Sequence, residues 1–308
     1  MKQAILRSVR WGALVGGLAF TACATHQVYP SGTRVSALRQ YEKHFPVTLQ
    51  KDVVYAHRNG QIALRGDLYR PEGQGPFPGV LVVHGGSWSG RDRSDFSGLS
   101  RYLAQRGFVA FNIDYRLAPV DRFPAALQDC KLAIRWMRAH AVEYGIDPRR
   151  IAGYGYSAGA HLVAMAALTR PSDGFEEVSR GGIENGLGSE LQAAVVGGTA
   201  ADLTLDPESP AVIEFLGTHW NQDPALFSKA SPISYVHAGS PPMFIYYGGA
   251  DTLVSPVQNT RLADALQRAQ VPVEVFRTFW LGHISAFILD EAEREAAISF
   301  LQRNLNSL

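Results

Sequence analysis

A serine between two glycines is the first feature of this sequence that could do chemistry. The motif Gly-Tyr-Ser-Ala-Gly at residues 155–159 lies between an apolar run ending at Tyr156 and a helix-like stretch over residues 161–169. A sharp strand-to-helix turn strains the serine backbone and brings neighbouring segments too close for side chains at the flanking positions. The motif therefore predicts that Ser157 is a nucleophile, and that the backbone N–H of Ala158, at a helix start, faces the charge developing on a substrate oxygen.

A second donor to that oxygen is expected from a glycine-rich loop. His84-Gly85-Gly86-Ser87-Trp88 follows the apolar run 79–83, and such a loop can turn free N–H groups toward the same point. Gly86 and Ser87 are the candidate donors. The alternative is a tight turn that packs against the sheet. Trp88 has two interpretations, because it could form the floor of a substrate pocket or pack on the sheet edge.

The serine also needs a base and a group that orients the base. The segment 155–159 resembles the nucleophile motif of the α/β hydrolases, and this resemblance implies a triad that follows the chain in the order Ser, Asp or Glu, His. His283 is the last histidine and the only one after Asp251, which itself follows the apolar run 243–247 through Gly-Gly-Ala. We predict Asp251 as the orienting acid and His283 as the base. Asp251 could instead cap a helix or turn, and Asp202, after the run 193–196, is the rival acid.

The elements that position these residues follow from hydrophobic periodicity. Residues 53–58 and 61–69 alternate around Asn59-Gly60, which predicts a β-hairpin. Beyond it, short apolar runs alternate with amphipathic stretches, which is typical of buried parallel strands with crossover helices. The predicted strands are 79–83, 109–112, 151–156, 193–196, 243–247 and 273–279.

The clearest helix begins at Pro124 and ends at Tyr144-Gly145, with Cys130 on its apolar face as a core thiol. Two stretches, 170–191 and 206–242, are expected to be loop-like insertions that form walls or a lid over a site at the carboxyl ends of the strands.

Composition narrows the class of protein. The 308 residues are 46% apolar and 19% charged, and the net charge is +1, which predicts one folded domain and gives no electrostatic footprint for nucleic acid. The two cysteines provide neither a disulfide framework nor a metal cluster. His84, His161 and His219 lack metal-ligand spacing and are treated as packing or surface residues.

The amino terminus predicts export. Basic residues precede an apolar run over 11–22 that is too short to span a bilayer comfortably. Residues 1–23 are therefore expected to be a signal peptide, with Cys23 as the lipidated residue of a cell-envelope lipoprotein in the outer membrane or periplasm. Simple cleavage and secretion is the alternative, and an uncleaved anchor is a third. Residues 24–45 are expected to be a tether, and 46–308 the catalytic domain.

With these motifs assembled, the chain resembles the α/β-hydrolase superfamily, and within it the hormone-sensitive-lipase-like carboxylesterases. The loop at 84–88 resembles the oxyanion motif of the branch that also includes kynurenine formamidases and isoprenylcysteine methylesterases. The resemblance covers about residues 53–305 and implies a mostly parallel central sheet, helices on both faces and small cap insertions. Further matching segments are Asp114-Tyr115-Arg116-Leu117-Ala118-Pro119, Phe123-Pro124, Tyr144-Gly145-Ile146-Asp147-Pro148, Arg150-Ile151, Ser231-Pro232 and Gly282-His283.

The resulting hypothesis is a serine hydrolase that cleaves small carboxylic esters through an acyl-enzyme, with no cofactor and no metal. An arylformamidase or other amidase would use the same triad, and a non-catalytic envelope binding protein is the alternative from another class. No long apolar lid helix is evident, which favours short acyl chains. Arg116, Asp114 and Asp129 are assigned to buried polar contacts that hold a loop.

Overall fold

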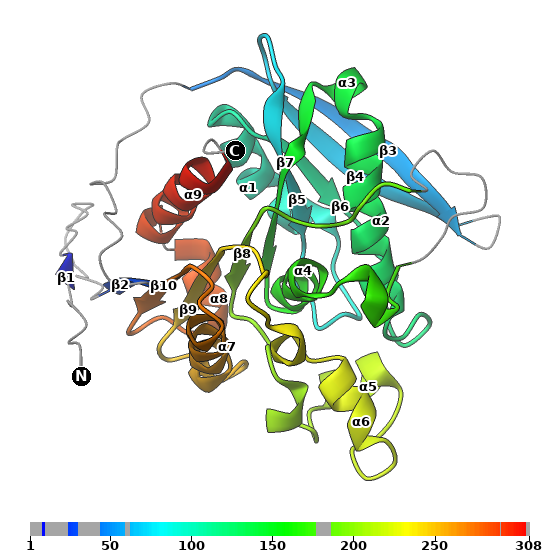
Figure 1. The fold of residues 1–308 in the computed structure, drawn as a ribbon, viewed down its shortest axis with the longest axis vertical. Helices are drawn as coiled ribbons and strands as arrows, with labels where there is room; N and C mark the ends of the chain where they lie inside the picture. The colour runs from blue at the N-terminus through cyan, green and yellow to red at the C-terminus, as the bar shows by residue number, and fades with distance from the viewer. Residues whose placement is uncertain are drawn as a thin grey trace.

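Six parallel strands, β5 to β10, form the centre of one sheet in the computed structural model of the chain (Figure 1). The structure describes residues 8–9, 24–29, 44–58, 62–176, 186–289 and 291–305. Within them the strand order is β1-β2-β10-β9-β8-β7-β5-β6-β4-β3, with antiparallel pairing at both ends. The strands are β1 (Ser8–Val9), β2 (Ala24–Tyr29), β3 (Val47–Arg58), β4 (Ile62–Pro71), β5 (Phe77–Val83), β6 (Val109–Ile113), β7 (Ile146–Tyr156), β8 (Ala193–Gly197), β9 (Met243–Gly248) and β10 (Val273–Thr278).

Helices cover both faces of this sheet (Figure 1). Side chains of α2, α4 and α7 enter one hydrophobic core, and those of α1 and α9 enter the other. The α-helices are α1 (Ser97–Gln105), α2 (Ala125–Ala139), α3 (Ala141–Tyr144), α4 (Ala158–Leu168), α5 (Pro210–Leu216), α6 (Pro224–Lys229), α7 (Pro256–Arg268), α8 (His283–Leu289) and α9 (Glu291–Leu305). Short 3₁₀ turns are η1 (Arg93–Phe96), η2 (Pro171–Asp173), η3 (Leu203–Leu205) and η4 (Pro232–Tyr235). The predicted fold class is confirmed.

The central strands are apolar throughout because helices cover both of their faces. Every residue of β6, β8 and β9 is buried, as expected for parallel strands between two helical layers. The predicted apolar runs lie in strands except for residue 279, which follows the end of β10. The hairpin of β3 and β4 lies at one end of the sheet, although its predicted turn at residues 59–60 is outside the described residues.

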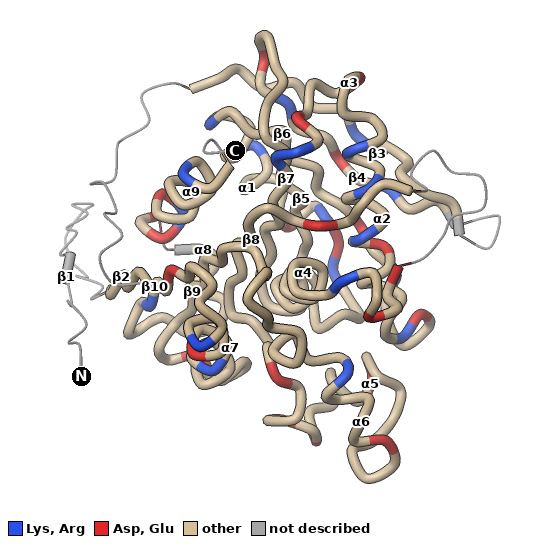
Figure 2. The backbone as a smooth tube through the Cα atoms, viewed as in Figure 1, with Lys and Arg blue, Asp and Glu red and all other residues tan. Residues whose placement is uncertain are grey.

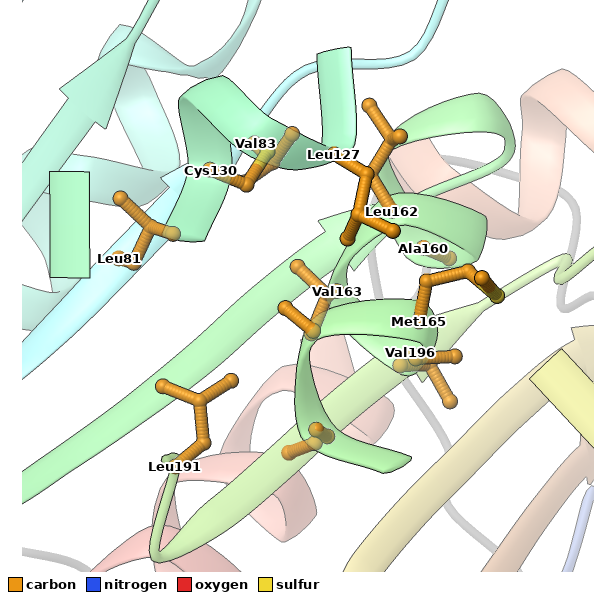
Figure 3. Close-up of a cluster of buried hydrophobic side chains, with 14 of the residues drawn as sticks. Leu81, Val83, Leu127, Cys130, Ala160, Leu162, Val163, Met165, Leu191 and Val196 are labelled. Carbon is orange, nitrogen blue, oxygen red and sulfur yellow. The ribbon is translucent and has the colours of Figure 1, made fainter. Parts of the chain in front are cut away.

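The larger core lies between the sheet and helices α2 and α4. Figure 3 shows side chains of β5, β8, α2 and α4 meeting there, among them Val83, Cys130 and Met165. Cys130 is fully buried, and burial raises the pKa of its thiol well above the ordinary value. It is the core thiol that the sequence predicted.

The predicted helix from Pro124 is divided in two by the structure. α2 ends at Ala139 and the short α3 follows, ending at Gly145 with φ of 69°. A glycine in this left-handed conformation is a common helix terminator because it has no Cβ to clash. Of the two stretches predicted to be loop-like insertions, 206–242 contains α5, α6 and η4 as well as loop.

The predicted tether is wrong for Ala24–Tyr29, which form β2. This strand pairs antiparallel with β10 over its whole length. All six of its residues are half-buried, so it lacks the polar and apolar alternation by which half-buried strands are recognised. His26 adds to the ambiguity, because this polar side chain packs against the rings of Phe244 and Phe276 and bonds to Glu274 at 2.9 Å.

The predicted signal peptide, including Cys23, lies outside the described residues apart from Ser8–Val9. Among the described helices, none has the length and hydropathy needed to cross a membrane. Charges of both signs are interspersed along the described chain (Figure 2).

Candidate active site

Ser157 lies in a strained turn between β7 and α4. Its backbone has φ 56° and ψ −124°, a conformation that non-glycine residues rarely adopt. The Ser157 N–H donates to the carbonyl of Gly197 at 2.7 Å, which fixes the turn to the end of β8. The side chain is thereby placed at the carboxyl edge of the sheet, where ligands bind in open α/β sheets.

The glycines on either side of Ser157 are required by close backbone approach. A Cβ at Gly159 would lie 2.1 Å from the carbonyl oxygen of Val83, and one at Gly155 would lie 2.4 Å from that of Gly159. Neither contact can be relieved by moving a flexible side chain. The predicted reason for these glycines, crowding at a sharp strand-to-helix turn, is what the structure shows.

The glycine-rich loop after β5 lies beside this turn. A Cβ at Gly85 would be 3.3 Å from the Cβ of Ser157. Within the described residues, the N–H groups of Gly86, Ser87 and Ala158 have no hydrogen-bond acceptor. For Ala158 this follows from its place in the first turn of α4. The predicted oxyanion donors are therefore free to bind a substrate oxygen, and their role remains a prediction.

Trp88 holds the glycine-rich loop against the elements around it. It is 4% exposed, and its ring stacks on Phe215 with 4.5 Å between centroids. Its Nε1–H donates to Nδ1 of His161 at 3.1 Å, and Nε2–H of His161 donates to the carbonyl of Ala230 at 2.7 Å. These contacts match the packing interpretation of Trp88, although its packing is on helical segments rather than on the sheet edge. Contact between Trp88 and substrate remains a prediction.

His161 is neutral in this arrangement. It is fully buried on α4, and this burial lowers the pKa of its imidazole to about 4. The neutral ring has one donor and one acceptor, which is what Ala230 and Trp88 require. Sequence reasoning treated His161 as a packing residue and gave no sign of this link between loop and helix.

Asp251 and His283 are brought together by the loops after β9 and β10. Nδ1–H of His283 donates to Oδ2 of Asp251 at 2.6 Å, and both residues are buried. Oδ1 of Asp251 accepts the N–H groups of Leu253 and Val254, both at 2.9 Å. Asp251 is thus the turn cap of the alternative interpretation and also the partner of His283.

The other ring nitrogen of His283 is unpaired. Nε2 is buried and has no hydrogen-bond partner among the described residues. A Cβ at Gly198 would lie 2.9 Å from Cε1 of His283, so the ring lies over the Gly197-Gly198 backbone to which Ser157 is bonded. The ring of His283 and the turn at Ser157 therefore both lie against Gly197-Gly198.

Tyr156 is a further residue at this point, and sequence reasoning missed it. Its hydroxyl donates to the backbone carbonyl of His283 at 2.5 Å, and the two rings lie 5.0 Å apart. Because Tyr156 directly precedes Ser157, it connects the turn at Ser157 with His283. A polar-tipped aromatic at the end of an apolar strand was the available signal.

The structure separates the rival acid from His283. Oδ1 of Asp202 accepts from the N–H and the hydroxyl of Thr204, at 3.2 and 2.6 Å, and Oδ2 lies 3.3 Å from Arg261. These contacts make Asp202 the cap of η3. Asp251 is the carboxylate that contacts the histidine.

The remaining polar residues that the sequence analysis considered hold loops. Arg116 contacts the fully buried Asp129 through its backbone N–H, Nε and Nη2, and Asp114 pairs with Arg93. His84 stacks on Tyr115 and bonds to the Gly85 carbonyl. Among the described residues, no group of three or more His, Cys, Asp or Glu could hold a metal ion.

Comparison with known proteins agrees with this geometry. A family model described as BD-FAE matches residues 66–266. The probable carboxylic ester hydrolase LipM of Mycobacterium tuberculosis is 35% identical over 200 residues, which cover 61% of this chain and 44% of LipM. Esterase LipQ of the same organism is 34% identical, covering 62% of this chain and 46% of LipQ. The chain thus spans less than half the length of these curated relatives.

Solved structures share the fold. Thermogutta terrifontis esterase 2, phosphonylated by cyclosarin, superposes with a TM-score of 0.70 at 26% identity, covering 82% of this chain and 93% of the esterase. A truncated carbohydrate esterase from gut microbiota gives a TM-score of 0.75 at 24% identity, covering 86% of this chain and 98% of that one.

Proposed function

The chain belongs to the BD-FAE family, and on that premise we propose that it is a serine carboxylesterase that cleaves small carboxylic esters. The observation that carries this proposal is the pairing of Asp251 with His283, whose Nε2 is unpaired and whose ring lies over the backbone that fixes Ser157. The names of the relatives support the reaction class, and the phosphonylated neighbour is an esterase of the same fold.

In the proposed mechanism His283 Nε2 takes the proton of the Ser157 hydroxyl, and the serine oxygen attacks the ester carbonyl carbon. The N–H groups of Gly86, Ser87 and Ala158 bind the oxyanion, where each such donor typically contributes about 3 kcal/mol to transition-state stabilisation. His283 then gives its proton to the leaving alcohol. A water activated by His283 hydrolyses the acyl-enzyme and restores Ser157.

Initial rates on p-nitrophenyl esters of increasing chain length and on N-formylkynurenine test this proposal, with Ser157→Ala as the blank. We expect serine-dependent rates that are highest on short esters. Selective turnover of the formamide would replace the proposal with an arylformamidase. No serine-dependent rate on any of these substrates would contradict it and favour the non-catalytic binding protein.

We also propose that the protein is exported and lipidated at Cys23. Support comes from the basic residues and the apolar run that precede this cysteine. Mass spectrometry of the mature amino terminus tests it: a diacylated cysteine at the first position is expected, and an unmodified residue after Cys23 would indicate simple secretion.

A further inference from the structure

Exposed apolar side chains surround the loops that carry Asp251 and His283. Trp280 is 77% exposed, Leu253 63%, and Ile284 and Ile288 are each 57% exposed. We refer to these four residues as the apolar rim. Burying large side chains of this kind stabilises a protein, so a surface with several of them left in water is typical of an interaction site.

The rim is one surface because the loops that carry it are bonded together. The N–H of Ala250 donates to the carbonyl of Leu281 at 3.1 Å, which joins the loop after β9 to the loop after β10. Ile284 and Ile288 are one helical turn apart on α8, and Trp280 lies in the turn that precedes this helix. Residues 278–289 include no Lys, Arg, Asp or Glu, and the neighbouring guanidinium of Arg277 lies over the ring of Phe279.

The amino-terminal strand begins at this same edge of the molecule. β2 lies beside β10 (Figure 1), and its first residue, Ala24, pairs with Thr278, the last residue of β10. Trp280 follows Thr278 by two residues, which is about 7 Å of extended chain. Whatever precedes Ala24 is therefore attached at the active-site edge, beside the apolar rim, and no tether separates Cys23 from the folded body.

We propose that the apolar rim docks on the surface of a lipid bilayer, with the active site facing the membrane. The proposal rests on the proposed lipidation of Cys23 and does not depend on the esterase reaction. A lipid attached next to Ala24 would hold the rim at the bilayer, and the exposed tryptophan suits the interface between head groups and acyl chains. A diacylated Cys23 would anchor the chain by itself, and the rim would add a contact that orients the folded body on the bilayer.

Leu253 and Ile284 of the rim adjoin the buried Asp251 and His283 along the chain. In the proposed orientation an ester carbonyl would therefore reach Ser157 from the membrane side, and esters dissolved in the bilayer surface would have the shortest path to it.

Fluorophore labelling of the full, lipidated chain on vesicles of phosphatidylethanolamine and phosphatidylglycerol tests the proposal. Ile288→Cys places an environment-sensitive nitrobenzoxadiazole on the rim. Val142→Cys is the matched control: Val142 is 99% exposed on α3, which precedes β7 at the opposite edge of the sheet. Cys130 is fully buried and Cys23 is occupied by lipid, so each variant offers one site for the dye.

We expect vesicles to shift the emission of the Ile288 label to the blue and to reduce its quenching by iodide several-fold, with no change at the Val142 label. Equal accessibility of both labels on vesicles, shielding of the Val142 label alone, or failure of the lipidated chain to bind vesicles would each overturn the proposal. Shielding of the Ile288 label without vesicles would overturn it in favour of contact with a second copy of the chain.

The esterase reaction is measured separately on the same samples. Both labelled variants are expected to hydrolyse soluble p-nitrophenyl acetate at the rate of the parent chain, since neither residue belongs to the proposed catalytic machinery. A missing esterase rate with correct docking would count against the proposed function alone, and a normal rate without docking would count against the docking surface alone.

Discussion

The Asp251 carboxylate has a separate partner for each oxygen. Oδ1 accepts the N–H groups of Leu253 and Val254, and Oδ2 accepts Nδ1–H of His283. These backbone donors fix the rotation of the Asp251 carboxylate. The imidazole is consequently held in the tautomer whose Nε2 is free to take a proton.

Asp251→Asn should therefore lower kcat by about four orders of magnitude, because an amide can present its NH₂ to the histidine and favour the wrong tautomer. Initial rates on p-nitrophenyl acetate measure the loss. Asp202→Asn is the matched control, since Asp202 contacts Thr204 and Arg261 instead. A larger loss of kcat in the Asp202 variant than in the Asp251 variant would contradict the assignment.

At this scale the sequence predicted the residues that belong to motifs and missed those that act through contacts. Ser157, Asp251 and His283 could be proposed from a motif, a chain order and strand-end positions. Tyr156 and His161 could not, because their roles depend on a hydroxyl reaching the carbonyl of residue 283 and on a ring nitrogen reaching Trp88. The position of Tyr156 at the end of an apolar strand marks it as a candidate, but a single sequence holds no pattern that identifies the distant partner of either side chain.

Among the elements, the turn between β7 and α4 depends on contact with the end of β5. Gly159→Ala would place a methyl group 2.1 Å from the Val83 carbonyl. Overpacking of this kind costs roughly 1–3 kcal/mol, and here it acts on backbone that cannot rotate away. We expect the free energy of unfolding to fall by at least that much, together with a loss of esterase rate.

Gly98→Ala is the control for this substitution. Gly98 is exposed near the start of α1, and a Cβ there would meet nothing within 4 Å. Alanine favours a helix over glycine by up to about 1 kcal/mol, so this variant should be as stable as the parent or more so. Denaturant unfolding compares the two variants. Equal free energies of unfolding for the two variants would contradict the predicted clash between a Cβ at Gly159 and the Val83 carbonyl.

The bonds from Trp88 to His161 to Ala230 connect the glycine-rich loop, α4 and the segment after α6. Ser87 and Trp88 have φ of 54° and 61°, which is strained backbone for non-glycine residues. The buried bond from the indole and the stacking on Phe215 hold this conformation. The link is thus expected to keep the oxyanion donors in place.

The same link predicts a pH dependence of stability. The pKa of His161 is about 4 in the folded chain and 6.5 in an ordinary environment. Between these pH values the unfolded chain carries a proton that the folded chain lacks. Stability is therefore fully present above about pH 6.5 and falls as pH decreases toward 4, by about 1.4 kcal/mol per pH unit from this group.

His161→Gln should flatten that dependence. Glutamine can accept from Trp88 and donate to Ala230, but it does not titrate. Denaturant unfolding at pH values from 7 to 4 measures the difference in slope between the variant and the parent. Parallel curves for the two proteins would show that folding does not lower the pKa of His161 and would contradict its neutral, buried state in the folded chain.

The elements also show where sequence patterns fail. The buried parallel strands were predicted because helices on both faces make them apolar throughout. β2 was missed because it is an edge strand, half-buried along its length, whose stability comes from pairing with β10 some 250 residues later. Helices α5 and α6, with seven and six residues, are too short for helical periodicity to emerge.

For the molecule as a whole, the two cores on opposite faces of one sheet predict cooperative unfolding. Cys130 reports on the larger core: its side chain is fully buried and burial raises the pKa of its thiol. Since the thiolate is the reactive form, the native thiol should be inert. In a Cys23→Ser chain, reaction with a disulfide reagent should follow the rate of global unfolding measured by circular dichroism. Rapid reaction without denaturant would show that α2 opens independently of the sheet.

In the proposed function the whole fold presents one activated serine. Incubation of the chain with a fluorophosphonate, followed by peptide mass spectrometry, tests it most directly, because only a serine activated by a base and an oxyanion site reacts readily with such a probe. We predict a single adduct on Ser157 that is lost in the His283→Ala variant. No adduct, or an adduct on another residue that persists in that variant, would contradict the account.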